Sequence, residues 1–270
     1  MNRSVTKRAA RVCVALLAAG AIVLSASARA CMTEEEPMPW EAMTTTTVPN
    51  AGGGAESYQV VAFETDDGLT LSGRLYGSAT KAVILSHMYP ADQTSWNPVA
   101  EELSRRGYLV LTFDFRGYGD SEGSKDDLGR IDQDVAAAFK HVASAGATDV
   151  VLVGASMGGT ASLTAAATFQ ALSSIRMAGV VTLSAPVEFM GLSAAAAVPN
   201  LVVPLLFIAA EGDEGAEGAR QLQELSGNTG DLQIVLGSAH GSELFTGAQA
   251  EEVWTMLLSF LEENMPAAVQ

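Results

Sequence analysis

A serine lies at the centre of the motif in this sequence that most clearly carries chemistry. Residues 154–158 read Gly-Ala-Ser-Met-Gly and match the pattern G-x-S-x-G around Ser156. The motif follows the apolar run DVVLVGA (149–155) and precedes an Ala-rich segment, about 157–172, that predicts a helix. A sharp strand-to-helix turn of this kind holds the central hydroxyl out at the end of a sheet, so Ser156 is a candidate nucleophile.

The neighbours of Ser156 suit this role for physical reasons. Gly154 and Gly158 lack a Cβ, so the strand and the helix can approach each other closely. The backbone N–H of Met157, at the start of the helix, can point towards an oxyanion that develops during attack. The pattern alone also fits a tight turn without chemistry, so the partners of the serine decide between the two interpretations.

A serine hydroxyl is a weak nucleophile near neutral pH and needs a base to take its proton. The chain has three histidines. His141 falls late in a predicted helix, far from a strand end, and we expect it on the surface. His87 ends a predicted strand, and His240 follows the last predicted strand in the segment LGSAHGSELF. Both therefore stand where parallel sheets bind ligands, at the carboxyl ends of strands.

The elements that must position these residues alternate between strand and helix. A turn at Asp66-Asp67-Gly68 between two strand-like runs predicts an opening β-hairpin. Continuous apolar runs such as VVLVG and PLLFI are expected where strands are buried on both faces of a sheet. The further strands are predicted at 82–87, 108–115, 149–155, 177–186, 202–210 and 231–237, and the helices at about 94–106, 129–145, 157–172, 215–226 and 243–263. This order predicts one α/β domain with a mostly parallel, eight-stranded sheet flanked by helices.

Several motifs in order resemble the α/β-hydrolase superfamily, from about residue 58 to residue 263. The segment FDFRGYGDSEG (113–123) resembles the superfamily's D-x-R-G-x-G-x-S segment after the fourth strand. LSHMYPADQTSW (85–96) resembles its H-G-x-x-x oxyanion loop after the third. The overall pattern is similar to small, lidless serine esterases and dienelactone-hydrolase-like enzymes. The resemblance implies an α/β-hydrolase fold and an acyl-enzyme intermediate, with no cofactor and no metal.

The resemblance also implies a Ser-His-Asp triad. Ser156 would be the nucleophile and His240 the base, because the superfamily places its catalytic histidine after the last strand. The acid should fall between them in the chain, in the loop after 202–210. Asp213 best matches the superfamily's position there; Glu211 is the main alternative, and Glu188 after the preceding strand is a third.

The oxyanion hole would use the backbone N–H of Met157 and of Tyr89. Met88 replaces the glycine that is usual in this loop, so the second donor stays open between Met88 and Tyr89. In the superfamily His87 shapes the loop and is not the base. We expect the remaining polar and aromatic residues of these segments to brace loops and cap helices: Asp92, Thr94, Trp96, Asp114 and Arg116.

The connection after the sixth strand, about 185–201, predicts one short helix at most, hence little or no lid. Met88, Tyr89, Met157, Phe189 and Met190 would then line an open apolar cleft. Such a site suits small or exposed acyl esters, so the substrate is expected to be a small-molecule ester.

The N-terminus has the layout of a secretory signal peptide over residues 1–30: a basic start, an apolar run and a small-residue stretch ending in Ala30. Cys31 follows directly, as in bacterial lipoproteins, although Ala28 stands where a larger aliphatic residue is usual. Residues 31–56 predict a flexible linker, and 57–265 the catalytic domain. We therefore expect an exported protein, either secreted or held in the cell envelope by a lipid at Cys31.

The net charge of −16 argues against a nucleic-acid partner and against binding to anionic lipid headgroups, so a membrane would be contacted only through a lipid anchor. The sequence alone is compatible with three functions. The leading one is a carboxylesterase. The others are a serine peptidase of prolyl-oligopeptidase type, which shares the catalytic domain, and a non-catalytic envelope protein that keeps the fold for binding.

Overall fold

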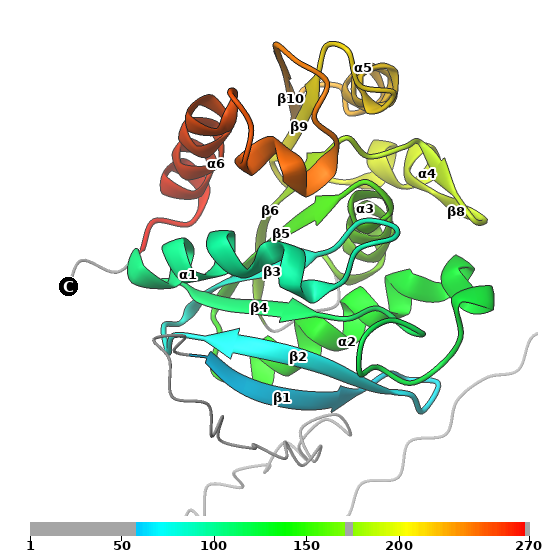
Figure 1. Ribbon diagram of the computed structural model, residues 1–270, viewed down its shortest axis with the longest axis vertical. Helices are drawn as coiled ribbons and strands as arrows, with labels where there is room; N and C mark the ends of the chain where they lie inside the picture. The colour runs from blue at the N-terminus through cyan, green and yellow to red at the C-terminus, as the bar shows by residue number, and fades with distance from the viewer. Residues whose placement is uncertain (1–57, 171–174, 268–270) are drawn as a thin grey trace, which may run out of the picture. The chain divides into compact units, whose positions relative to one another are not determined.

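One sheet of eight strands organises the part of the chain that the computed structural model describes, residues 58–170 and 175–267. The strand order is β1-β2-β4-β3-β5-β6-β9-β10 (Figure 1). The strands are β1 (Tyr58–Glu64), β2 (Thr70–Tyr76), β3 (Lys81–Ser86), β4 (Leu109–Phe113), β5 (Asp149–Ala155), β6 (Arg176–Leu183), β9 (Leu205–Ala210) and β10 (Gly230–Val235). The predicted signal peptide, Cys31 and the linker lie outside the described residues.

The sheet is parallel except at its start. β1 pairs with β2 and β2 with β4 in antiparallel register, while the pairs β4–β3, β3–β5, β5–β6, β6–β9 and β9–β10 are parallel. This confirms the opening hairpin and the mostly parallel sheet expected from the sequence. Because the parallel strands end at one edge, the loops that follow β3, β5, β6, β9 and β10 meet there.

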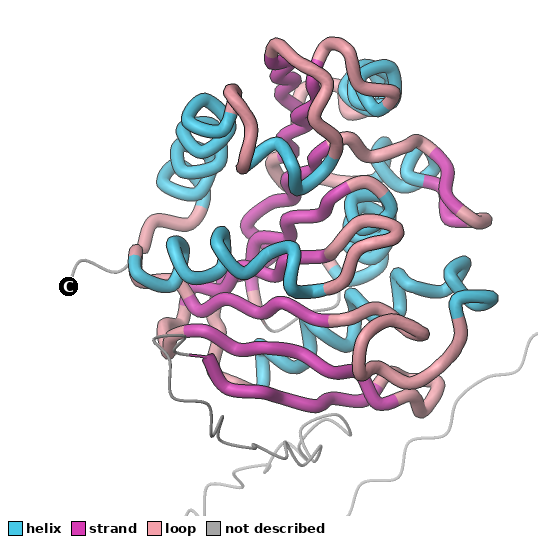
Figure 2. Tube along the Cα trace, viewed as in Figure 1, coloured by secondary structure: helices cyan, strands magenta, loops and turns pink. Residues whose placement is uncertain are grey.

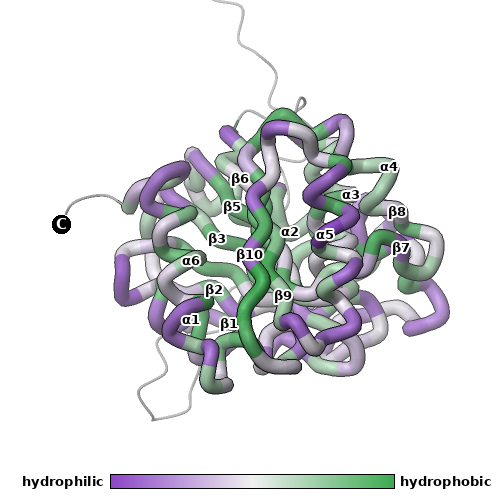
Figure 3. Tube along the Cα trace, turned by 90° about the horizontal axis from the view of Figure 1, so that it is seen from above, coloured by the Kyte–Doolittle hydropathy of each residue, from purple (hydrophilic) through white to green (hydrophobic). Residues whose placement is uncertain are grey.

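Helices cover both faces of the sheet, as Figure 2 shows. They are α1 (Asn97–Arg105), α2 (Ile131–Ser144), α3 (Met157–Phe169), α4 (Ala194–Ala197), α5 (Gly215–Leu225) and α6 (Ala250–Asn264). Apolar residues of α2, α3 and α5 pack on one face, and those of α1 and α6 pack on the other. Successive residues of β3 alternate between the two cores: Ala82 and Ile84 face the first, Val83 and Leu85 the second. The central strands β3, β4, β5, β6 and β9 are therefore mostly apolar, while hydrophilic residues also occur along the edge strand β10 (Figure 3).

Three predicted helices begin later than expected, because a 3₁₀ turn precedes each. The turns are η2 (Gln93–Trp96), η3 (Lys125–Arg130) and η5 (Gly241–Phe245). Pro98 lies in the first turn of α1, where its fixed φ favours a helix start and its missing N–H costs nothing. Gly247 lies between η5 and α6, and glycine is a poor residue for the interior of a helix. The last helix accordingly starts at Ala250 and not near residue 243.

The connection between β6 and β9 holds more structure than the single short helix expected. It forms a small hairpin, β7 (Glu188–Phe189) and β8 (Leu192–Ser193), then α4 and a 3₁₀ turn η4 (Val198–Asn200). Met190 and Gly191 both have positive φ, which is the geometry of a two-residue hairpin turn. The usual sequence signal for that turn is Asn-Gly. This hairpin has Met-Gly instead, so the sequence did not predict it.

His141 was expected on the surface, and this is wrong. It is buried, and its ring stacks on Phe63 of β1 at a centroid distance of 4.9 Å. α2 packs against both α3 and the sheet, so its buried side is wider than one helical stripe and includes this position. Burial lowers the pKa of His141 to about 4.

Candidate active site

Ser156 occupies the sharp turn between β5 and α3 that its motif predicts. Its backbone has φ 48° and ψ −118°, a conformation that non-glycine residues rarely adopt. Its N–H donates to the carbonyl oxygen of Leu183 at 2.8 Å, which ties the turn to the end of β6. The side chain keeps partial exposure while the residues on both sides of it are buried. The fold thus presents the hydroxyl of Ser156 at the carboxyl edge of the sheet.

Close contacts explain the two glycines of the motif. A Cβ at Gly158 would lie 2.4 Å from the carbonyl oxygen of Ser86 and 2.6 Å from that of His87. A Cβ at Gly154 would lie 2.3 Å from the carbonyl oxygen of Gly158. Because neither residue has a Cβ, α3 can start directly against the ends of β3 and β5.

Met157 is the first residue of α3, so its N–H belongs to the helix-terminal amides that have no partner within the helix. These amides and the helix dipole favour negative charge. The side chain of Met157 was expected to line an open cleft, and this is wrong, because it is fully buried in the core. Its contribution to a site would come from the backbone alone.

His240 and Asp213 lie in contact, 27 residues apart in the chain. Nδ1 of His240 and Oδ1 of Asp213 are 2.8 Å apart. The side chain of Asp213 is 4% exposed and that of His240 is 27% exposed. The carboxylate is therefore buried behind an imidazole that still reaches solvent.

The other two carboxylates considered for this contact lie elsewhere. Glu211 is exposed in the loop after β9. Glu188 is exposed on β7 and accepts a hydrogen bond from the hydroxyl of Ser193 at 2.5 Å. Of the three candidates, the structure brings Asp213 to His240.

The loop that carries His240 lies on the end of the strand that leads to Ser156. Gly241 has φ 57°, and a Cβ there would lie 3.3 Å from Cβ of Ala155. The turn η5 that follows packs against β5, β6 and β9. The serine turn and the histidine loop consequently meet at the same edge of the sheet.

His87 uses both of its ring nitrogens within the fold. Nε2 accepts a hydrogen bond from the N–H of Phe115 at 3.1 Å, so Nδ1 carries the proton and donates to the carbonyl oxygen of Met88 at 3.0 Å. The ring is fully buried, and burial lowers the pKa of His87. A histidine held in this way braces the loop after β3 and has no nitrogen left to accept the proton of a serine.

Met88 and Tyr89 follow β3 in the loop that was expected to supply an oxyanion donor. The side chain of Met88 packs under the histidine loop: a Cβ at Gly241 would lie 2.7 Å from its Sδ, and the hydroxyl of Ser242 points at this sulfur from 3.8 Å. Tyr89 is exposed. A methionine at the usual glycine position therefore connects the loop after β3 to the loop of His240.

The family model for the α/β hydrolase fold matches residues 81–215, half of the chain. This protein belongs to the α/β hydrolase fold family. The match runs from β3 to the start of α5, so it covers Ser156 and Asp213 and ends before His240.

Solved structures of α/β hydrolases have the same fold. The esterase Pf2001 from Pyrococcus furiosus superimposes with a TM-score of 0.68 at 21% sequence identity, over 80% of this chain and 99% of that one. The α/β hydrolase GrgF from Penicillium sp. sh18 gives a TM-score of 0.65 at 18% identity, over 83% and 99%. At these identities the likeness concerns the fold.

Two curated relatives share shorter stretches of sequence. The polyketide transferase claH of Penicillium crustosum is 35% identical over 108 residues, which are 36% of this chain and 35% of the transferase. The thiohydrolase aneE of Aspergillus aculeatus is 44% identical over 71 residues, 25% of this chain and 22% of that protein. The matches thus span at most 35% of each relative's own length.

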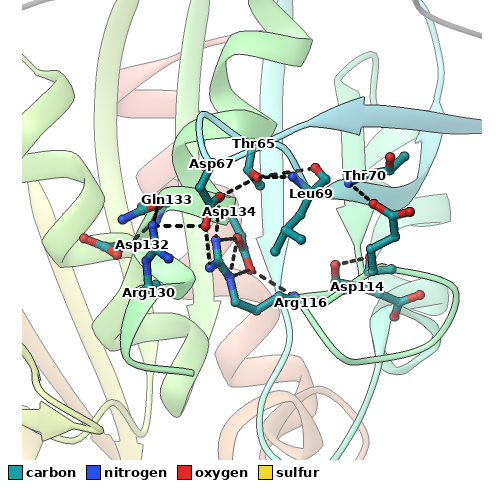
Figure 4. Close-up of polar contacts among 12 residues, drawn as sticks. Thr65, Asp67, Leu69, Thr70, Asp114, Arg116, Arg130, Asp132, Gln133 and Asp134 are labelled. Carbon is teal, nitrogen blue, oxygen red and sulfur yellow. Dashed lines mark hydrogen bonds and ion pairs between the residues drawn. The ribbon is translucent and has the colours of Figure 1, made fainter. Parts of the chain in front are cut away.

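In this α/β hydrolase, the segment after β4 braces its neighbours, as expected. Asp114 accepts from the backbone and the side-chain amide of Gln93, at 2.9 and 2.7 Å. Arg116 lies between Asp134 of α2 and Asp67 of the first hairpin turn (Figure 4). Its guanidinium is buried and paired with a carboxylate on both sides, which fits a structural role.

Asp92 and Thr94 also brace as expected, because Asp92 caps η2 by accepting from the N–H and the hydroxyl of Thr94. Trp96 is buried and packs edge-on against Phe245, and its side chain makes no capping hydrogen bond to the helix.

Among the described residues, no group of three or more His, Cys, Asp or Glu side chains is placed to hold a metal ion. Nor does the described part of the chain contain a helix long and apolar enough to cross a membrane.

Proposed function

We propose that this protein is an exported serine hydrolase that cleaves carboxylic esters through Ser156, His240 and Asp213. The observation that carries the proposal is the 2.8 Å contact between His240 and Asp213, in a loop that packs on the end of β5 beside Ser156. A nucleophile, a base and a group that orients the base are the parts that acyl transfer needs.

Each residue has a distinct task in this reaction. Oγ of Ser156 attacks the acyl carbon, while Nε2 of His240 takes the hydroxyl proton and then passes it to the leaving alcohol. Asp213 accepts the hydrogen bond of Nδ1–H and so holds the tautomer in which Nε2 is free to take that proton. The N–H of Met157 and a second N–H, from Tyr89 or Met88, stabilise the oxyanion. Water then attacks the acyl-serine by the same route and releases the acid.

Carboxylic esters are the substrate class that these features favour. The segment between β6 and β9 is a small hairpin and two short helical turns, too little to enclose a long substrate. Tyr89 and Met190 are exposed apolar side chains on loops that follow β3 and β6. An open site with apolar neighbours suits short or exposed acyl groups. The names esterase and thiohydrolase among the relatives agree with cleavage of an acyl bond to oxygen or sulfur.

A panel of p-nitrophenyl esters of increasing acyl length, together with thioesters and aminoacyl anilides, tests the proposal. We expect turnover of short esters by the wild type and loss of that turnover in Ser156→Ala and His240→Ala. Glu188→Ala is the matched control, because this exposed carboxylate is one of the two candidate acids without a contact to His240 and bonds Ser193 instead. Faster turnover of anilides than of esters would favour the peptidase alternative. Turnover of nothing in the panel, with no labelling of Ser156 by a fluorophosphonate, would favour the binding-protein alternative.

Export is proposed on the sequence alone. The signal-peptide layout of residues 1–30, Cys31 directly after Ala30 and the strongly negative charge of the chain support it. The intact mass of the protein purified from its own host tests both forms of this proposal. Cleavage before Cys31 with added diacylglycerol and acyl mass indicates the lipid-anchored form, and cleavage without added mass the secreted form. A mass that retains residues 1–30 would contradict cleavage.

A further inference from the structure

We infer that Ser184 is a positioning residue that fixes the loop of His240, through a hydrogen bond to the backbone of Gly241. The inference rests on the proposed function, because it gives Ser184 a role that acts through the proposed base. Ser184 is not part of any motif identified in the sequence, and its role emerges from its contacts.

Ser184 directly follows β6, the strand between the one that leads to Ser156 and the one that leads to Asp213. It is fully buried and has φ 58°, in the left-handed region that a non-glycine residue rarely adopts. A glycine would adopt this backbone conformation at lower cost. The feature that serine adds at this position is therefore its hydroxyl.

That hydroxyl accepts a hydrogen bond from the N–H of Gly241 at 3.1 Å, and the contact is buried. Gly241 is the residue after His240, so the bond fixes the backbone that carries the imidazole. Without the hydroxyl, the buried N–H of Gly241 would lose this hydrogen bond. A movement of the loop that lets the N–H bond to water would then lower the free energy. Such a movement would carry His240 away from its position beside the serine turn.

Backbone contacts around Ser184 connect it to the other two triad segments. The carbonyl oxygen of the preceding Leu183 accepts the N–H of Ser156 at 2.8 Å. The N–H of Ser184 donates to the carbonyl oxygen of Ile208 on β9 at 2.8 Å. A Cβ at Gly215, two residues after Asp213, would lie 2.7 Å from Cα of Ser184. Residues 183–184 thus touch the segments that carry nucleophile, acid and base, and the hydroxyl supplies the contact to the base.

The contact of Met88 with the same loop is of a different kind. Its sulfur is a weak hydrogen-bond acceptor, and its packing against Gly241 is apolar and without strong direction. The hydrogen bond that Ser184 accepts from the N–H of Gly241 is directional and involves the backbone itself. Ser184 therefore sets the orientation of the loop, while Met88 fills the space beneath it.

The test compares Ser184→Ala and Ser184→Gly with the wild type on the best ester of the panel. We expect kcat to fall about ten- to hundred-fold while KM stays within about two-fold, because the base is misplaced and the substrate surface is unchanged. Ser184→Gly protects the test against misfolding, since glycine tolerates the positive φ. Ser184→Cys should give an intermediate kcat, because a thiol is a weaker acceptor of similar shape. Ser226→Ala is the matched control: this buried serine bonds the carbonyl oxygen of Gln223, in the turn before β10.

A double-mutant cycle with Asp213→Ala separates positioning from general stability. If Ser184 acts through the orientation of His240, Ser184→Ala should lower kcat by less than about two-fold once Asp213 is gone. Full additivity of the two losses would overturn the inference. An unchanged kcat in Ser184→Ala and Ser184→Gly, beside an inactive Ser156→Ala, would also overturn it and leave the proposed function standing. Full activity of Ser156→Ala would overturn the proposed function, and the inference with it.

Discussion

Asp213 and Asp134 are two buried carboxylates, each in contact with an ionisable partner, and their surroundings differ. Asp134 and Arg116 are both almost fully buried, with side chains 0% and 1% exposed. The two oxygens of Asp134 receive the backbone N–H of Arg116 and its guanidinium, at distances from 2.6 to 3.2 Å. Asp213 uses Oδ1 for His240, and its buried Oδ2 has no hydrogen-bond partner among the described residues.

The difference supports a structural role for the Arg116–Asp134 pair and agrees with the chemical role proposed for Asp213 and His240. A buried ion pair is tolerable when its hydrogen-bonding capacity is filled, as it is around Arg116. A buried carboxylate with a free oxygen and a partner that reaches solvent is a costly arrangement for stability alone. Proteins retain such arrangements where a proton must be moved, which fits the tasks proposed for Asp213 and His240.

The largest effect is expected from a substitution of Asp213 that acts on catalysis. Asp213→Asn should lower kcat by a factor of about 10⁴, because the amide can donate to Nδ1 and favour the wrong tautomer of His240. Steady-state kinetics on a short ester measure this effect. Glu211→Gln is the matched control, as an exposed carboxylate two residues away in the same loop, and it should stay within about two-fold of the wild type. The same loss in both variants would contradict the assignment of Asp213.

The next largest effect is expected on the stability of the fold, from a substitution of Arg116. Arg116→Met leaves the charge of Asp134 buried and unpaired, and should lower the free energy of unfolding by about 3–5 kcal/mol. Urea denaturation at neutral pH measures the loss, and the kcat of the folded protein should stay close to that of the wild type.

Arg130→Met is the matched control for that experiment. Arg130 is about half exposed and also pairs with Asp67, so its loss should cost about 0–1 kcal/mol. Equal losses of stability in the two variants would show that the buried ion pair of Arg116 contributes no more to stability than the half-exposed pair of Arg130.

His141 is a third buried ionisable residue, and its Nε2 lacks a hydrogen-bond partner among the described residues. Burial lowers its pKa to about 4 in the folded protein, below the ordinary value near 6.5. The unfolded chain therefore takes up this proton first as the pH falls, and stability is lost between about pH 6.5 and pH 4.

His141→Phe removes that proton and keeps a ring against Phe63. Between pH 7.5 and pH 5 the wild type should lose about 2 kcal/mol more stability than the variant, as measured by urea denaturation at both pH values. Between pH 7.5 and pH 9 the two proteins should change in parallel. An equal loss of stability in the two proteins between pH 7.5 and pH 5 would mean that folding does not lower the pKa of His141.

The sequence predicts the fold well because the central parallel strands, such as β5 and β9, are buried on both faces and appear as continuous apolar runs. The turn of Ser156 is also visible, since its close contacts require glycines at fixed positions. The burial of His141 could not be predicted, because it depends on how α2 packs against both α3 and β1. The role of Ser184 is invisible for a similar reason: its partner, Gly241, lies 57 residues away and is brought to it by the sheet.

Labelling with a fluorophosphonate probe, followed by peptide mass spectrometry, asks directly whether Ser156 is the nucleophile. We expect one phosphonylated residue, Ser156, with labelling that is lost in Ser156→Ala and strongly slowed in His240→Ala. Labelling of another serine, or labelling of Ser156 at an equal rate when His240 is replaced, would contradict this expectation.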